Sequence, residues 1–175
     1  MKANEFLKNH GLRVEDVDSD KVLDFFSSEM KKGLEGKASS LAMIPTYSEA
    51  GHKIPEGESV IVLDAGGTNF RTCLVTFNNG VAEISDFQKM GMPGAKEEVS
   101  AKEFFSILAD SIERFMGKSK KIGFCFSYAA EITPDHDGIP LMFSKEIKAP
   151  EVIGKRLGKE LLSELSSRGY DTTGM

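Results

Sequence analysis

The chain has 175 residues, enough for about one domain whose core needs no disulfides. It carries 22 Lys and Arg against 27 Asp and Glu, a net charge of −5 with no basic run, which argues against nucleic acid as a partner. Its polar, charged first residues and its lack of any run of about 18 apolar residues argue against a signal peptide or a membrane span. We therefore expect a cytoplasmic protein without a membrane partner.

Two cysteines, Cys73 and Cys125, both stand in apolar runs. Two cysteines are too few for a disulfide framework, and the sequence shows no secretory segment. We expect two reduced, buried thiols.

The first expected element is an amphipathic helix. Ser19 is placed to cap its start, and Gly36 follows its end. From Ser39 to Ser59, prolines and glycines break any regular element, so this stretch is predicted to be a connector with an apolar anchor at 41–44. The helix is indicated by apolar side chains that recur every four residues: Val22, Phe26, Met30 and Leu34.

Three β-rich runs come next along the chain. Residues 60–65 and 70–77 flank a Gly-Gly-Thr-Asn turn, and residues 81–87 follow the tight-turn pair Asn79-Gly80. The spacing predicts a hairpin that continues into a three-stranded antiparallel meander.

A second helix is expected after the capping box formed by Ser100 and Glu103, with Gly117 closing it. The apolar run 122–128 follows that helical crossover, so it should join the sheet in parallel. Asp137-Gly138 then predicts a turn that leads into residues 139–143. The apolar face of the helix comprises Phe104, Phe105, Leu108, Ile112, Phe115 and Met116.

The final helix is predicted to open at Pro150 and to end at Arg168-Gly169. Gly154 and Gly158 fall inside it, where each costs about 1 kcal/mol relative to Ala, so we expect close packing on a neighbour there. Its apolar stripe comprises Ile153, Leu157, Leu161 and Leu165.

The turn after the first strand could carry chemistry. Asp64 ends a buried strand, and Gly66 and Gly67 would let the backbone amides approach a phosphate. Asp64 could hold Mg²⁺ through water, and Arg71 could add a positive charge. The turn lacks both the P-loop and the dinucleotide-binding patterns, so these residues taken alone favour a simple hairpin.

The segment LDAGGTNFR, residues 63–71, closely resembles the first phosphate motif of the hexokinase family. Upstream, FSSEMKKGLEGKASSLAMIPTY (26–47) is similar to the family's helix and its SLxMLPTY connector. Downstream, GFCFSYAAE (123–131) and DGIPLMFSKEIKAP (137–150) resemble its two sugar-binding segments. The matches run in order from about residue 20 to residue 165.

The resemblance implies an α/β fold of the actin-like ATPase or ribonuclease-H-like type: a three-strand meander, then a helix and a parallel strand, here incomplete. Residues 59–175 would form the small lobe without its final strand. Residues 1–58 would pack on, or link to, a large lobe that belongs to the same polypeptide.

The resemblance also implies a function. The family uses Mg-ATP to phosphorylate a hexose at its 6-hydroxyl, the first step of glycolysis, and glucose is the hexose we expect. By position, Ser127 and Tyr128 would contact the sugar, because they stand where the family's Ser-Phe pair does so. Ser144 and Lys145 would contact it in the place of the family's Thr-Lys pair. The implied nucleotide-phosphate residues are Asp64, Gly66, Gly67, Thr68, Asn69 and Arg71, with Asp64 also holding Mg²⁺ through water.

The sequence departs from the family pattern at several points. Ala129 replaces a Pro, and Ser144, Glu146 and Ile147 replace the Thr, Gly and Phe of a TKGF stretch. The family's catalytic base is the Asp of an Asn-Asp-Thr sequence, which these 175 residues do not contain. We therefore expect no catalytic base within the chain, and little kinase activity from the chain alone.

Two alternative functions stay open at this point. A non-catalytic sugar or nucleotide sensor would keep the binding residues without a base, and an interaction module would bind no sugar. The three histidines, His10, His52 and His136, have no metal-ligand spacing, so we expect them to be solvated. Asp135 and Asp137 are interpreted as turn residues.

Overall fold

The computed structural model describes residues 3–44, 56–143 and 147–175. The chain divides into two compact units, Met1–Ile44 and Pro45–Met175. Each unit is described by itself. None of the helices within the described ranges is long and apolar enough to cross a membrane.

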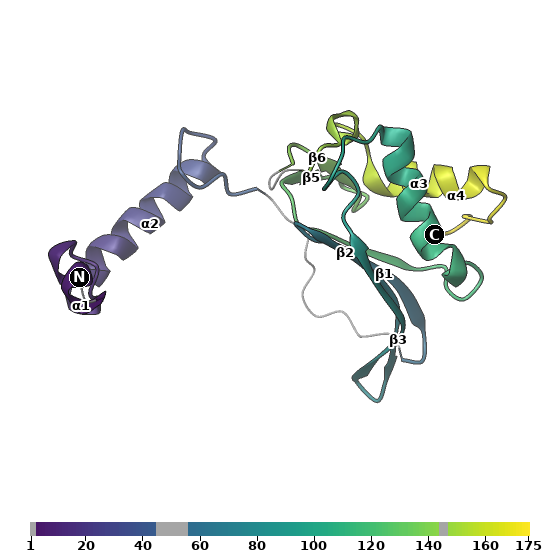
Figure 1. Cartoon of the computed structure of the whole chain (residues 1–175), viewed down its shortest axis with the longest axis horizontal. Helices are drawn as coiled ribbons and strands as arrows, with labels where there is room; N and C mark the ends of the chain where they lie inside the picture. The colour runs from purple at the N-terminus through teal and green to yellow at the C-terminus, as the bar shows by residue number, and fades with distance from the viewer. Residues whose placement is uncertain (1–2, 45–55, 144–146) are drawn as a thin grey trace. The chain divides into compact units, whose positions relative to one another are not determined.

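The first unit consists of helix α1 (Ala3–Asn9), a 3-10 turn η1 (Val14–Asp16) and helix α2 (Ser19–Leu34) (Figure 1). The cap of α2 is Asp18, whose side chain accepts a hydrogen bond from the Lys21 amide at 3.2 Å. The prediction of Ser19 as the cap was wrong by one residue. Asp18 has the extended backbone of a cap, while Ser19 is already the first helical residue.

The segment after α2 folds back onto the helix. The Glu29 carboxylate is buried and accepts hydrogen bonds from the Ser40 amide (2.8 Å), the Ser40 hydroxyl (3.0 Å) and Lys32 Nζ (2.7 Å). A Cβ at Gly33 would lie 2.1 Å from the Leu41 carbonyl oxygen and 2.8 Å from Met43 Cγ. The start of the predicted connector is therefore fixed to α2, and its apolar anchor passes a position that only glycine can occupy.

The second unit is built on a four-stranded sheet in the order β3-β2-β1-β4. Its strands are β1 (Ser59–Ala65), β2 (Asn69–Asn78), β3 (Val81–Gly91) and β4 (Ile122–Phe126). Strands β1, β2 and β3 pair antiparallel and β4 pairs with β1 in parallel, which confirms the predicted meander and crossover. The predicted parallel strand, residues 122–128, was too long, because β4 ends at Phe126 rather than at Tyr128.

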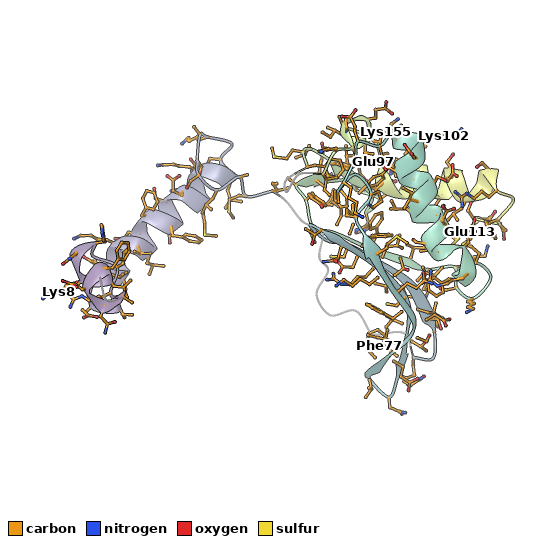
Figure 2. All side chains as sticks on the ribbon, viewed as in Figure 1. Lys8, Phe77, Glu97, Lys102, Glu113 and Lys155 are labelled. Carbon is orange, nitrogen blue, oxygen red and sulfur yellow. The ribbon has the colours of Figure 1, made fainter. Side chains whose placement is uncertain are left out.

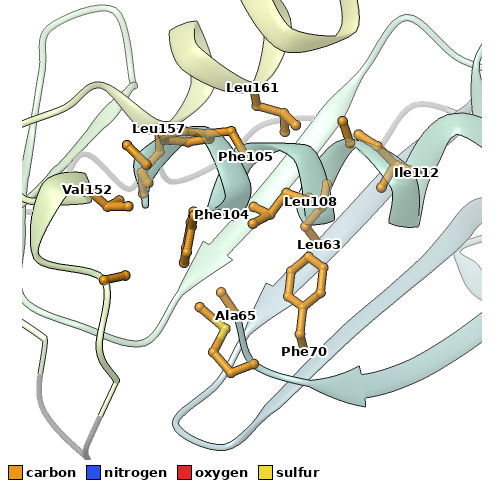
Figure 3. Close-up of a cluster of buried hydrophobic side chains, with 14 of the residues drawn as sticks. Leu63, Ala65, Phe70, Phe104, Phe105, Leu108, Ile112, Val152, Leu157 and Leu161 are labelled. Atoms are coloured by element: carbon orange, nitrogen blue, oxygen red, sulfur yellow. The ribbon is translucent and has the colours of Figure 1, made fainter. Parts of the chain in front are cut away.

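Helix α3 (Ala101–Ile112) and its 3-10 extension η2 (Glu113–Phe115) cover one side of this sheet (Figure 1). The predicted cap is confirmed, since the Ser100 hydroxyl accepts from the Glu103 amide at 3.2 Å. The core lies between α3 and the sheet, where Leu63, Phe70 and Leu108 are completely buried (Figure 3). The hairpin end of β2 and β3, near Phe77, extends away from the helices (Figure 2), and all of β3 is exposed.

The final helix, α4 (Leu157–Ser167), begins later than predicted. Pro150–Val152 forms only a 3-10 turn (η3), and Gly154 has a φ of +78°, which ends that turn. The inclusion of Gly154 in the helix was therefore wrong. Gly158 lies within α4 as expected, and a Cβ there would meet the Asp137 carboxylate at 3.0 Å, which confirms the close packing.

A small second sheet pairs β5 (Ala130–Ile132) with β6 (Gly138–Pro140). The sequence did not indicate β5, which is three residues long, and the apolar run 139–143 is strand only at its start. Cys73 is buried as expected, but Cys125 is exposed. The second assignment was wrong because Cys125 points away from the core that its neighbours Phe124 and Phe126 pack against.

Candidate functional site

The candidate phosphate turn, residues 66–69, joins β1 to β2. The antiparallel register places Asp64 of β1 opposite Arg71 of β2, so the two side chains share one face of the sheet. Arg71 Nη1 donates to Asp64 Oδ2 at 2.6 Å, and about a third of each side chain is exposed. Arg71 therefore holds the carboxylate in one orientation at the mouth of the turn.

Backbone hydrogen bonds close the turn on both sides. The Gly66 amide donates to the Asn69 carbonyl at 3.0 Å, and the Met92 amide donates to the Thr68 carbonyl at 3.2 Å. A Cβ at Gly66 would lie only 3.0 Å from the Asn69 carbonyl oxygen, so a larger residue would open the turn. The hairpin therefore has a fixed, narrow tip.

Donors at the tip are available for a ligand. Within the described ranges, the amides of Gly67 and Thr68 donate to no protein acceptor. The exposed Thr68 side chain accepts from Asn69 Nδ2 at 3.0 Å, which leaves its hydroxyl proton able to point outward. Successive amides without a protein acceptor, together with a hydroxyl, can form an anion-binding arrangement that does not need a helix.

The end of β4 lies against the same turn. The Ser127 amide donates to the Ala65 carbonyl at 3.0 Å, and the Tyr128 hydroxyl donates to the Gly66 carbonyl at 2.9 Å. The Ser127 residue is exposed, whereas Tyr128 is buried, and this burial raises the pKa of the Tyr128 hydroxyl. Residues 127 and 128, predicted to bind sugar, therefore lie next to the residues predicted to bind phosphate.

An aromatic cluster supports this edge of the sheet. The Tyr128 ring lies 5.0 Å from the Phe126 ring and 5.1 Å from the Phe143 ring, measured between centroids. Phe143 directly precedes Ser144 and Lys145, the second predicted sugar pair, which lie outside the described residues. The cluster brings the chain leading into that pair close to Tyr128.

The turn also offers a ligand of the kind that a magnesium ion takes in proteins. Mg²⁺ keeps several of its waters and binds through one or two carboxylates together with substrate phosphates. Asp64 offers one such carboxylate, and its second oxygen takes no hydrogen bond from the part of the chain that the structure describes. No cluster of three His, Cys, Asp or Glu side chains that could hold a metal by itself occurs among those residues.

Sequence reasoning missed one feature of the site. It assigned Tyr128 to sugar contact by position, whereas the structure directs its hydroxyl to the backbone of the turn. The signal was present, because tyrosine stands where the resembled motif has phenylalanine, and the extra hydroxyl requires a partner when it is buried. His10 and His136, as expected, are exposed, and Asp137 caps α4.

Comparisons with known proteins agree with one another. The family model described as "Hexokinase" matches residues 2–173. Human hexokinase-3 is 33% identical over 145 residues, which cover 79% of this chain and 16% of that protein. Hexokinase-1 of Saccharomyces cerevisiae is 29% identical over 164 residues, covering 87% of this chain and 34% of that protein.

A solved structure is also similar to this chain. A hexokinase from Schistosoma mansoni complexed with glucose has a TM-score of 0.65 and 26% sequence identity, and the match covers 86% of this chain and 36% of that one. The expected fold class, part of an actin-like ATPase fold, is confirmed by this likeness. The chain spans about a third or less of the length of these relatives.

Proposed function

This chain belongs to the hexokinase family, and from that premise we propose that it supplies part of the active site of an ATP-dependent hexose kinase. The expected reaction transfers the terminal phosphoryl group of Mg-ATP to the 6-hydroxyl of a hexose, with glucose as the preferred sugar. We further propose that the protein acts in the cytoplasm, at the first step of glycolysis.

The observation that carries this proposal is the shared edge of β1, β2 and β4. The Gly67 and Thr68 amides directly follow Ala65 and Gly66 in the turn. The Ala65 carbonyl accepts a hydrogen bond from the Ser127 amide, and the Gly66 carbonyl accepts one from the Tyr128 hydroxyl. A phosphate at the turn and a sugar at Ser127 would therefore be neighbours. Phosphoryl transfer depends mainly on such positioning and on charge stabilisation.

Each residue of the edge has a definite role in this proposal. The Gly67 and Thr68 amides and the Thr68 hydroxyl donate to phosphate oxygens, and Asp64, oriented by Arg71, accepts from the waters of the metal. The Mg²⁺ that accompanies ATP neutralises charge on the phosphates. Ser127, with Ser144 and Lys145, would hydrogen-bond the sugar hydroxyls, which favours sugars over analogues that lack those hydroxyls.

The base that accepts the proton of the 6-hydroxyl is proposed to come from outside these 175 residues. In the family pattern it is the Asp of Asn-Asp-Thr, a sequence that this chain lacks. The complete enzyme would supply it, together with the opposite wall of the cleft. We therefore expect the 175-residue chain by itself to form no hexose 6-phosphate at an ordinary kinase rate.

The test is a coupled assay of hexose 6-phosphate formation, using the protein at the length its cells make. Thr68→Ala removes one phosphate donor and should lower kcat/KM for Mg-ATP by about 10- to 100-fold, the effect of losing one hydrogen bond to a charged group. Ser127→Ala should instead raise the KM for glucose. The exposed Thr173→Ala is the matched control and should leave both constants unchanged.

Two results would contradict the kinase proposal. Sugar binding by the same protein without any phosphoryl transfer would favour a non-catalytic sensor. Absence of both sugar and nucleotide binding would favour an interaction module.

A further inference from the structure

Tyr128 makes a contact that the resembled family motif cannot make. In that motif the residue after the serine is phenylalanine, which has no hydroxyl. Here the hydroxyl of Tyr128 donates to the Gly66 carbonyl across 2.9 Å. The side chain is almost completely buried, and this burial raises the pKa of its hydroxyl, so the group stays protonated and keeps donating at neutral pH.

The bond acts on the peptide group that carries a proposed phosphate donor. The Gly66 carbonyl and the Gly67 amide belong to one planar peptide unit, which is trans, since no cis peptide bond occurs in the part of the chain that the structure describes. In a trans unit the N–H points opposite to the C=O. Because the Tyr128 hydroxyl fixes the direction of the Gly66 carbonyl, it also fixes the direction of the Gly67 N–H, away from Tyr128 and out of the turn.

Glycine makes this control necessary. Gly66 and Gly67 together have more backbone freedom than any other pair of residues, so an unrestrained peptide between them can rotate. The Gly66 amide is held by the Asn69 carbonyl at 3.0 Å, but that bond lies on the other side of the Gly66 Cα. Of the contacts that the structure describes in this turn, the Tyr128 bond is the one that holds the Gly66–Gly67 peptide.

The ring of Tyr128 is itself well held. It packs against Phe126 at the end of β4, with 5.0 Å between ring centroids, and against Phe143 at 5.1 Å. The backbone amide of its neighbour Ser127 donates a hydrogen bond to the Ala65 carbonyl. The Tyr128 hydroxyl therefore reaches the turn from a ring whose position is fixed by its neighbours. Ser127 directly precedes Tyr128, and Phe143, which packs on the ring, directly precedes Ser144.

We propose that Tyr128 is a positioning residue that aims the Gly67 amide at the nucleotide phosphates and couples the turn to the sugar-binding strand end. This inference rests on the proposed function in assigning a nucleotide to the turn. In this role Tyr128 acts through the backbone of the turn. This role differs from the direct sugar contact that the position of Tyr128 in the motif implies.

Kinetics of the protein at its native length test the functional half. Tyr128→Phe keeps the ring contacts and removes only the hydroxyl. It should raise the KM for Mg-ATP about fivefold, as expected for one lost hydrogen bond, and leave the KM for glucose within about twofold. Tyr170→Phe, at the far end of α4, is the matched control and should change neither constant. A larger effect on the glucose KM than on the Mg-ATP KM would overturn the proposal in favour of direct sugar contact.

Nitrogen-15 NMR relaxation of the unliganded protein tests the structural half without any enzyme assay. The order parameter of the Gly67 N–H should be about 0.85, typical of rigid backbone, in the parent and in Tyr170→Phe, and should fall below about 0.6 in Tyr128→Phe. An unchanged Gly67 order parameter in Tyr128→Phe overturns the proposal, whatever the kinetics show. A lower order parameter with an unchanged Mg-ATP KM overturns the phosphate role. A lower order parameter in a protein that phosphorylates no sugar rejects the proposed function and leaves the control of the turn by Tyr128 standing.

Discussion

Asp64 and Arg71 form one functional unit because the register of the first hairpin places them opposite each other. From the sequence, Arg71 was expected to add a positive charge near the phosphates. In the structure its guanidinium donates to the Asp64 carboxylate at 2.6 Å. Arg71 therefore serves first to orient Asp64. Both side chains are partly exposed, so water and salt screen the pair and its effect should be modest.

Replacing Arg71 with Met should release the Asp64 carboxylate and lower kcat/KM for Mg-ATP about three- to fivefold. Lys89→Met is the matched control, because Lys89 pairs with Arg71 on β3, on the same face, and is exposed. The assay is steady-state kinetics of the native-length protein at fixed ionic strength. Equal losses in the two variants would show a general charge effect and contradict the specific pairing.

Glu29 gives the first unit a dependence on pH. The hydrogen bond from Lys32, and then those from Ser40, lower the pKa of the Glu29 carboxyl from its ordinary 4.5 to about 2. Folding therefore favours the charged form. The stabilisation is complete above about pH 5, and it is lost as the pH falls from there toward 2.

Carbon-13 NMR of the Glu29 side chain should show a titration midpoint near 2. Glu29→Gln should loosen residues 39–41 at neutral pH, seen as faster amide exchange at Ser40. A Glu29 midpoint above 4 would contradict the buried network.

At the scale of elements, α4 begins where a distant carboxylate caps it. Asp137 lies 20 residues before Leu157, yet it accepts hydrogen bonds from the Gly158 amide (2.7 Å) and the Lys159 amide (3.1 Å). It also accepts from the Gly138 amide at 2.8 Å. The Asp137 side chain thus links the turn before β6 to the start of α4. It accepts hydrogen bonds from helix amides that usually bond to a capping residue next to the helix.

Asp137→Ala should lower the free energy of unfolding by about 1–2 kcal/mol, the range for loss of an N-terminal cap. Asp135→Ala is the control, since Asp135 is an exposed partner of Arg156, and its loss should be smaller. Gly158→Ala should also destabilise, against the usual preference of helices for alanine, because its Cβ would meet Asp137. Denaturant unfolding measures all three, and an Asp137→Ala loss no larger than that of Asp135→Ala would contradict the cap.

The elements that could be predicted are those whose signals are local. Three β-rich runs and the Asn79-Gly80 turn indicated β1 to β3, and the Ser100 capping box indicated the start of α3. The start of α4 could not be predicted in this way, because Asp137 acts through space and the stripe from Ile153 continues the helical period. The three-residue β5 is too short to show a period.

The candidate site also has features with local sequence signals and features that depend on contacts between distant segments. Its residues and their order along the chain were recognisable from the LDAGGTNFR motif and from the segment 123–131, which contains Ser127 and Tyr128. The hydrogen bond of Tyr128 to Gly66 and the pairing of Arg71 with Asp64 depend on register and on contacts between distant segments. Ser144 and Lys145 stay predictions, because they lie outside the described residues.

At the scale of the whole molecule, we assign phosphate and sugar to one edge of the sheet, and these 175 residues contain no Asn-Asp-Thr sequence, where the family resemblance places the base. It spans 34% of the yeast relative and 16% of the human one. Our account therefore assigns the base and the opposite wall of the cleft to a longer polypeptide. A protein that ended at Met175 would have to act by binding alone.

The most direct test is the intact mass of the polypeptide that contains this sequence, purified from the cells that make it by its hexose kinase activity. Our account predicts a mass well above the 19.1 kDa of these 175 residues, with the sequence of the turn present in the active fraction. A purified active species of 19.1 kDa would contradict the account, because it would phosphorylate sugar without the missing base.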